Sequence, residues 1–176
     1  LIGVVGRVAY PALAGRGEAD LRAKSLLALR ASAAAVPPAL IWLSIFAAPA
    51  VWLALGEKWV APCAPLLRWL ALYLAFTALF SPISPLDYLR DRPDLSLAYN
   101  LASFLARLAG LAWGGRHSLE AAVAGYSIGA SAVWLGYSFV LAWLMRCPAG
   151  RFHGAWLRFA PLWMALGLAL WAVRRG

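Results

Sequence analysis

The chain has 176 residues, of which 64% are hydrophobic and 13% charged, and its net charge is +9. A soluble domain averages roughly 45–50% apolar and about 25% charged residues. The composition therefore excludes an ordinary soluble domain and indicates lipid as part of the solvent. Ten tryptophans and six tyrosines suit this, because such rings concentrate at membrane–water interfaces.

Long apolar runs, each with one charge at most, predict an all-α, polytopic membrane helical bundle. A bilayer core of about 30 Å takes about 20 residues of apolar helix, and the runs lack the alternation of barrel strands. We expect five transmembrane helices and one partial N-terminal helix within a single membrane domain, residues 1–176. The five spans are 31–55, 59–86, 95–115, 121–145 and 159–173, and the partial helix is 1–15. Because the chain begins inside an apolar stretch, we expect a fragment of a longer membrane protein.

The first 30 residues predict the partial helix, interrupted by Arg7, and then a basic segment. Residues 16–30 form either an amphipathic helix on the membrane surface or a connector that continues into the first span. Late in that span, Pro49 is expected to kink or break the helix, because proline has no amide hydrogen to donate.

The sequence "GEKW" at residues 56–59 predicts the turn after the first span. Gly56 suits a helix end, and Trp59 suits the membrane interface. Arg68 follows within ten residues of this turn. Its side chain either extends outward to the interface or faces a cavity inside the bundle.

Residues 87–94 carry five charges between the second and third spans. We interpret them as a solvated turn. Asp91 or Asp94 is the expected N-cap of the next helix, because a short carboxylate side chain accepts from the first free amides.

The third span carries a polar stripe of Ser96, Asn100, Ser103 and Arg107, spaced 4, 3 and 4 residues apart. This spacing places the four side chains on one helix face. An arginine inside the membrane costs at least about 2.5 kcal/mol, so it is not expected to face lipid. The stripe either lines an aqueous cavity where Arg107 attracts an anionic group, or Arg107 extends to the outer interface while Asn100 bonds a neighbouring helix.

The fourth span carries small residues with the same spacing, Gly125, Gly129, Ala132 and Gly136. Small side chains let another helix approach closely in lipid. We therefore expect this face to be a helix–helix contact.

The distribution of lysine and arginine predicts the orientation of the spans. It places 16–30 and 87–94 on the cytoplasmic side, and "GEKW" and "GGRHSLEA" on the outside. Because loop arginines and lysines of a membrane protein account for the positive charge, no nucleic-acid partner is expected.

No pattern predicts an enzyme, a metal ion or a cofactor. His117 and His153 are expected in loops on opposite sides, and no acidic residue falls inside a predicted span. Cys63 and Cys147 are also expected on opposite sides, so they should form neither a disulfide nor a metal site.

Four motifs in order carry a resemblance to a known family. They are "VVGRVAYPALA", "DLRAKSLLALR", "LGEKWVAPCAPLLRWLAL" and "RPDLSLAYN". Their order resembles the C-terminal half of bacterial polysaccharide exporters, the oligosaccharide-lipid flippases of the multidrug/oligosaccharidyl-lipid/polysaccharide exporter superfamily. The colanic-acid-exporter-like branch is the most similar, and the match is most specific over residues 1–101.

This resemblance implies a two-lobed exporter of about fourteen helices, of which the chain would cover the end of the eighth to the thirteenth. It implies alternating access that moves an undecaprenyl-diphosphate-linked oligosaccharide across the bacterial inner membrane. The partners would be this lipid-linked substrate, membrane lipids and the N-terminal lobe of the same chain. Arg7 best matches a family position in the cationic cavity, whereas Arg68, Asn100 and Arg107 are substrate-binding candidates from the residues alone.

Several functions remain open at this point. A drug exporter or a lipid II exporter of the same superfamily would share the fold. A membrane-embedded glycan polymerase or acyltransferase would need a reactive cluster in a large outer loop, and a non-catalytic scaffold would not need Arg107.

Overall fold

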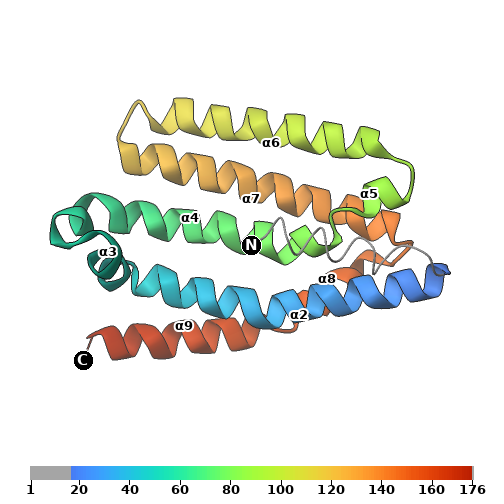
Figure 1. The fold of residues 1–176 in the computed structure, drawn as a ribbon, viewed down its shortest axis with the longest axis horizontal. Coiled ribbons are helices and arrows are strands. Elements are labelled where there is room, and N and C mark those ends of the chain that lie inside the picture. Colours follow the sequence, from blue (N-terminus) through green and yellow to red (C-terminus); the bar gives the residue numbers. More distant parts are fainter. Residues whose placement is uncertain (1–16, 176) are drawn as a thin grey trace.

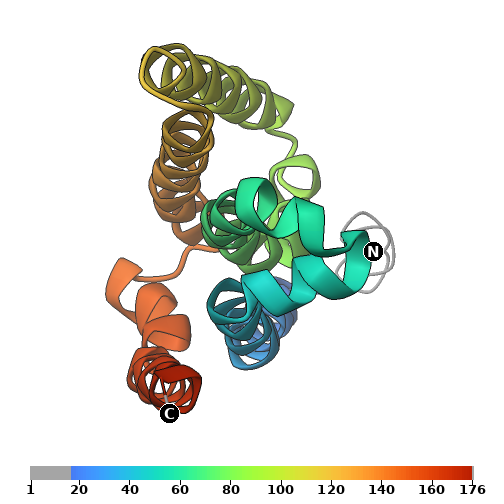
Figure 2. The same ribbon diagram turned by 90° about the vertical axis from the view of Figure 1, so that its left-hand side faces the viewer.

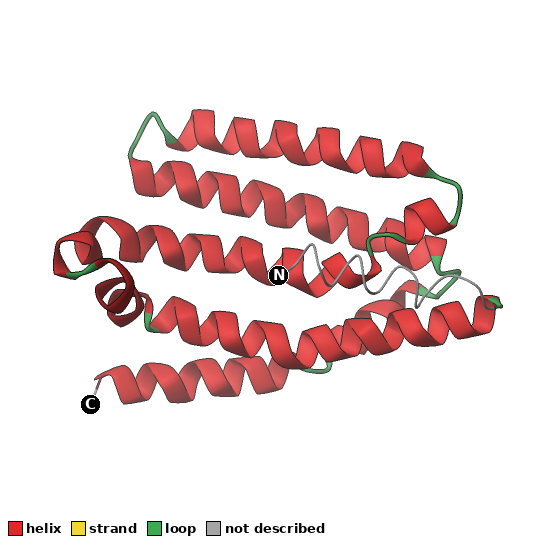
Figure 3. Cartoon of the chain, in the orientation of Figure 1, coloured by secondary structure: helices red, strands yellow, loops and turns green. Residues whose placement is uncertain are grey.

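A computed structural model describes residues 17–175, and the described chain is helical with no strand in it (Figure 3). In chain order the elements are α2 (Glu18–Ile45), α3 (Ala47–Leu55), η1 (Glu57–Trp59), α4 (Val60–Phe80), η2 (Ser81–Ile83), α5 (Leu86–Leu89), α6 (Pro93–Gly114), α7 (Leu119–Leu144), α8 (Ala149–Leu157) and α9 (Ala160–Arg175). This confirms the all-α prediction. The expected partial helix and Arg7 lie outside the described residues.

Five segments are long and apolar enough to cross a membrane, as predicted. They are Glu18–Ile45, Glu57–Leu89, Pro93–Gly114, Leu119–Leu144 and Ala149–Val173. The last one joins α8 and α9, so it is longer than the expected span 159–173. His153 accordingly lies in helix α8 and not in a loop.

The long helices lie side by side along one axis (Figure 1). α6 forms one edge and packs on α7, α7 packs on α4, α4 on α2, and α2 on α9 at the other edge, an order also visible end-on in Figure 2. In the most apolar 18-residue stretch of α7, 50% of the residues are buried, compared with 6% in the corresponding stretch of α6. α7 is therefore the most buried of the long helices, and α6 leaves most of its surface exposed.

The first span begins and ends earlier than predicted. α2 starts at Glu18 and runs on without a break, with Leu26 and Leu29 buried in the core. Within the predicted segment 16–30, the described residues from Glu18 onward are therefore no separate surface helix but lead directly into the span. At its other end the helix stops at Ile45, where Pro49 has no amide hydrogen to donate four residues back. The predicted break at this proline is confirmed, and the chain restarts as α3.

The turn predicted at "GEKW" is present. Gly56 has a φ of +89°, a conformation that glycine adopts without strain, and its amide donates to the Trp52 carbonyl at 2.9 Å. Glu57 and Lys58 are exposed, and the Lys58 ammonium lies 5.8 Å from the centre of the Trp59 ring.

The small-residue face of α7 makes the predicted contact over half of its length. The backbones of Gly125 and Gly110 are so close that a Cβ on either glycine would collide with the other's carbonyl. A Cβ on Gly129 would lie 2.7 Å from the Ala106 carbonyl oxygen. Ala132 is exposed, and a Cβ on Gly136 would meet no atom within 4 Å, so these two positions do not belong to the interface.

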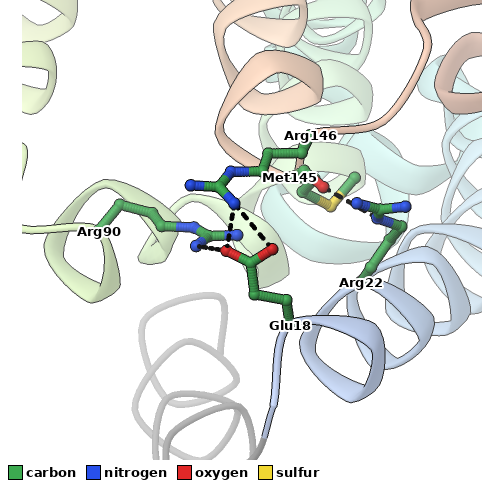
Figure 4. Close-up of polar contacts among 5 residues, drawn as sticks. All are labelled: Glu18, Arg22, Arg90, Met145 and Arg146. Carbon is green, nitrogen blue, oxygen red and sulfur yellow. Dashed lines mark hydrogen bonds and ion pairs between the residues drawn. The ribbon is translucent and has the colours of Figure 1, made fainter.

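One end of the bundle gathers three segments that the sequence places on the same side. Figure 4 shows the Glu18 carboxylate between Arg90, which follows α5, and Arg146, which follows α7. The N–O distances are 2.9 Å to Arg90 and 2.8 Å to Arg146. Arg22 donates from Nε to the Met145 carbonyl at 3.0 Å in the same region. α3 and the α6–α7 turn lie at the opposite end in Figure 1, which agrees with the predicted alternation of sides.

Candidate functional site

Arg107 is held between three helices. It is the fifteenth residue of α6, about 10 Å along the axis from the helix end at Gly114. Its Nη2 donates to the Tyr73 hydroxyl of α4 at 3.2 Å. The guanidinium carbon lies 5.0 Å from the centre of the Tyr73 ring and 5.5 Å from that of Tyr126 on α7. The two rings meet edge to face at 5.5 Å, so they form an aromatic cage around the charge.

The positive charge in this cage has no carboxylate partner among residues 17–173, whose side chains the structure describes. Arg107 Nε is buried and also lacks a hydrogen-bond acceptor there. A guanidinium has five N–H donors, and a single tyrosine hydroxyl accepts from one of them. Cation–π contact lowers the free-energy cost of removing this charge from water. The cage nevertheless supplies no anion that would neutralise the guanidinium.

The polar stripe of α6 does not act as one unit. Ser103 is buried, whereas Asn100 is exposed. Asn100 Nδ2 donates to the Ser96 carbonyl at 2.9 Å within its own helix, and not to a neighbouring helix. Asn100 therefore lies apart from the Arg107 cage.

Asn100 instead lines a cavity of about 260 Å³ between η2, α5, α6 and α7, which we call the polar pocket. Its walls carry hydroxyl, amide and carboxylate groups together with aromatic rings. The lining residues are Ser81, Ser84, Pro85, Asp87, Tyr88, Ser96, Tyr99, Asn100, Trp134 and Tyr137.

Asp87 is the unexpected member of this pocket, because its side chain is buried and only 1% of the residue is exposed. Oδ2 accepts from the Tyr137 hydroxyl at 3.0 Å, and Oδ1 accepts from the Tyr88 amide at 2.8 Å. The prediction of a solvated turn is wrong at this position. Helical spacing could not show its burial, because η2 and the turn at residues 84–85 separate Asp87 from α4.

The turn after Asp87 also differs from the predicted cap. The N-cap of α6 is Arg92, no side chain caps the helix, and Pro93 occupies its first position. The missing proline amide removes one donor that a cap would satisfy. Asp94 pairs with the Arg92 guanidinium at 2.9 Å, and this hydrogen bond raises the pKa of Arg92. Asp91 has a φ of +53° and belongs to the turn.

Arg68 is exposed and lies in a different place. It lines a mainly apolar groove of about 190 Å³ between α2 and α4, where Ser44 contributes a hydroxyl. The structure thus brings Arg107 together with no other predicted site residue. Arg68 and Asn100 each belong to a separate cavity, and Arg7 is outside the described residues.

His153 of α8 contacts α7 and contributes to the packing of these two helices. Its Nδ1 lies 2.8 Å from the Ala149 carbonyl and its Nε2 lies 3.0 Å from Ser138 Oγ. The ring also contacts Phe139 at a centroid distance of 4.5 Å. Within residues 17–173, no three His, Cys, Asp or Glu side chains gather as metal ligands.

Comparisons with protein-family models, with curated proteins and with solved structures find no match for this chain.

Proposed function

We propose that the chain is part of the C-terminal lobe of an exporter that moves a lipid-linked oligosaccharide across the bacterial inner membrane by alternating access. It transports its substrate and catalyses no covalent reaction. The observation that carries the proposal is the charge of Arg107, held inside the third span without a carboxylate partner in the described chain.

A diphosphate-linked sugar offers the anion that this charge lacks. Removing an arginine from water is costly, and hydrogen bonds to an anionic oxygen offset that cost better than neutral acceptors do. Tyr73 and Tyr126 fix the orientation of the guanidinium, because the planar group stacks on aromatic rings and still presents its edge donors. The cage therefore suits transient binding of a phosphate, which transport requires.

The packing of α6 on α7 supports a transporter that moves as rigid parts. Gly110 and Gly125 bring the two backbones into contact, so the pair resists separation. The exposed apolar face of α6, which includes Leu97, Leu101 and Phe104, fits lipid or the second lobe of such an exporter.

A lipid II exporter is the second candidate, because its substrate also carries a diphosphate and the charge of Arg107 favours it equally. The same charge disfavours a drug exporter for cationic compounds, since it would repel them.

The test is transport of lipid-linked oligosaccharide by the protein reconstituted in liposomes. We expect Arg107→Gln to lower the transport rate at least about tenfold, the loss for one charge-assisted hydrogen bond of about 1.5 kcal/mol. Arg107→Lys keeps the charge and should retain part of the rate. Arg116→Gln, which removes an exposed arginine after α6, is the matched control.

Transport at the normal rate by the Arg107→Gln variant would overturn the proposal. A second arm with lipid II in place of the oligosaccharide substrate decides between the two candidates, because the true substrate is the one that the unmodified protein moves.

A further inference from the structure

A basic pocket lies at the end of the bundle where α5, α6 and α7 meet. Its volume is about 280 Å³, and its walls are Arg90, Arg92, Trp143, Leu144 and Arg146. The arginines come from two separate stretches of chain, before α6 and after α7. Three guanidinium groups around one small cavity form an arrangement that recognises phosphate oxygens.

The arginines already converge on one oxyanion. Arg90 Nη1 and Arg146 Nη1 both contact Glu18 Oε1, at 2.9 and 2.8 Å (Figure 4). The Glu18 side chain is 47% exposed. Water can therefore solvate its carboxylate when the side chain moves away from the two arginines. Arg90 Nε is buried and has no acceptor in the described part of the molecule. The ion pairs of Arg90 therefore leave one of its N–H donors unsatisfied.

The pocket retains positive charge after its ion pairs are counted. Glu18 neutralises one of the two arginines that it contacts, and Asp94 pairs with Arg92. Three cations therefore face two carboxylates, and one positive charge is left over. Arg22 adds a further cation nearby, where its Nε donates to the Met145 carbonyl.

The position of the pocket along the membrane normal indicates the source of its ligand. Arg92 immediately precedes the first residue of α6, and Arg146 follows the last residue of α7 by two positions. Both positions are ends of membrane-spanning segments, where the phosphates of lipid headgroups lie. Trp143 is 60% exposed, and the Arg92 guanidinium lies 5.7 Å from the centre of its ring. An exposed tryptophan beside arginine is typical of the headgroup level.

We propose that Arg90, Arg92 and Arg146 bind a phosphate group at the membrane interface, with an anionic phospholipid headgroup as its source. Glu18 occupies the same donors in the absence of the phosphate and competes with it. The proposal uses none of the residues of the Arg107 cage and holds or fails independently of the transport proposal.

The test uses the full chain in nanodiscs of phosphatidylcholine with increasing phosphatidylglycerol, and native mass spectrometry counts the retained anionic lipids. We expect Arg92→Gln to weaken retention about tenfold, the effect of losing one hydrogen bond to a charged group. Arg151→Gln is the matched control, because it removes an exposed arginine of α8 that does not line the pocket.

Glu18→Gln separates binding from folding. If Glu18 competes with phosphate, its neutralisation tightens lipid retention severalfold, although the ion pairs with Arg90 and Arg146 are lost. Unchanged or weaker retention in this variant would overturn the competition and with it the proposed site. Equal retention by Arg92→Gln and Arg151→Gln would do the same.

A second arm distinguishes the source of the phosphate. Inorganic phosphate is added to the protein in pure phosphatidylcholine nanodiscs, and the melting temperature is followed. Stabilisation that disappears in Arg92→Gln, without retention of phosphatidylglycerol, would assign the pocket to free phosphate and overturn the lipid source. Retention of phosphatidylglycerol without this stabilisation supports the headgroup.

Discussion

The Tyr137 hydroxyl donates a hydrogen bond of 3.0 Å to the Asp87 carboxylate, and 6% and 1% of these residues are exposed. This bond joins the short helix α5 to α7, the most buried of the long helices. Its carboxylate has a second donor, the Tyr88 amide, at 2.8 Å. A buried carboxylate is costly unless its oxygens accept hydrogen bonds. The pair therefore stabilises the end of the bundle next to the polar pocket.

Tyr137→Phe removes the hydroxyl and leaves Asp87 Oδ2 without its donor. We expect a loss of about 1.5–3 kcal/mol in the free energy of unfolding, as for hydrogen bonds to charged groups. The measurement is denaturant or thermal unfolding in detergent micelles. Tyr88→Phe is the control, because the Tyr88 hydroxyl accepts from Ser96 Oγ on the exposed side and its loss should change little. Equal stability of the two variants would contradict a structural role for the Asp87–Tyr137 bond.

The burial of Asp87 was not predicted from the sequence, because charged residues surround it there. Arg90, Asp91 and Arg92 within five residues are typical of a solvated turn. The buried carboxylate of Asp87 accepts a hydrogen bond from Tyr137, which lies fifty positions away in the sequence and on another helix. A long-range partner of this kind leaves no local pattern, so the polar pocket had to be seen in the folded chain.

Gly125→Ala is expected to disturb the contact of α6 with α7. The added Cβ would collide with the Gly110 carbonyl, which is backbone and cannot rotate away. We expect the two helices to move apart and the free energy of unfolding to fall by about 1–3 kcal/mol, the usual effect of overpacking. The measurement is unfolding in micelles, together with the rate of disulfide crosslinking between cysteines introduced at the facing ends of the two helices.

Gly136→Ala is the matched control on the same helix. No atom lies within 4 Å of its added Cβ, so the change should be neutral or stabilising by up to about 1 kcal/mol, the helix preference of alanine over glycine. If both alanine variants behave alike, the close contact at Gly125 does not limit stability.

The spacing of small residues predicted a contact face on α7 correctly, but not its extent. Gly125 and Gly129 touch α6, whereas Ala132 and Gly136 do not. The partner face on α6 has the same signature, since Ala106, Gly110 and Gly114 follow at intervals of four. Spacing within one helix identifies a face, but the crossing angle of two helices decides how far along they stay in contact.

Apolar length predicted the number of spans because the cost of polar backbone in lipid acts on each segment separately. It did not predict their ends. α2 includes Asp20 and Lys24, which pair at 3.0 Å in the first turns, so the helix begins well before the uncharged run. For the candidate site, sequence placed Arg107 on a helix face, but the aromatic cage depends on Tyr73 and Tyr126 from two other helices.

The predicted orientation can be tested with two single cysteines in a chain whose own Cys63 and Cys147 are replaced by serine. Lys58 and Arg151 are both exposed, in η1 and at the start of α8, and they belong to opposite ends of the bundle. Because lysine and arginine are more abundant at the end that holds Arg151, this end should be cytoplasmic. A maleimide that cannot cross membranes is therefore expected to label Lys58→Cys in intact spheroplasts and Arg151→Cys only after the membrane is opened. The reverse pattern would invert the orientation, and labelling of both from outside would contradict an odd number of membrane crossings between them.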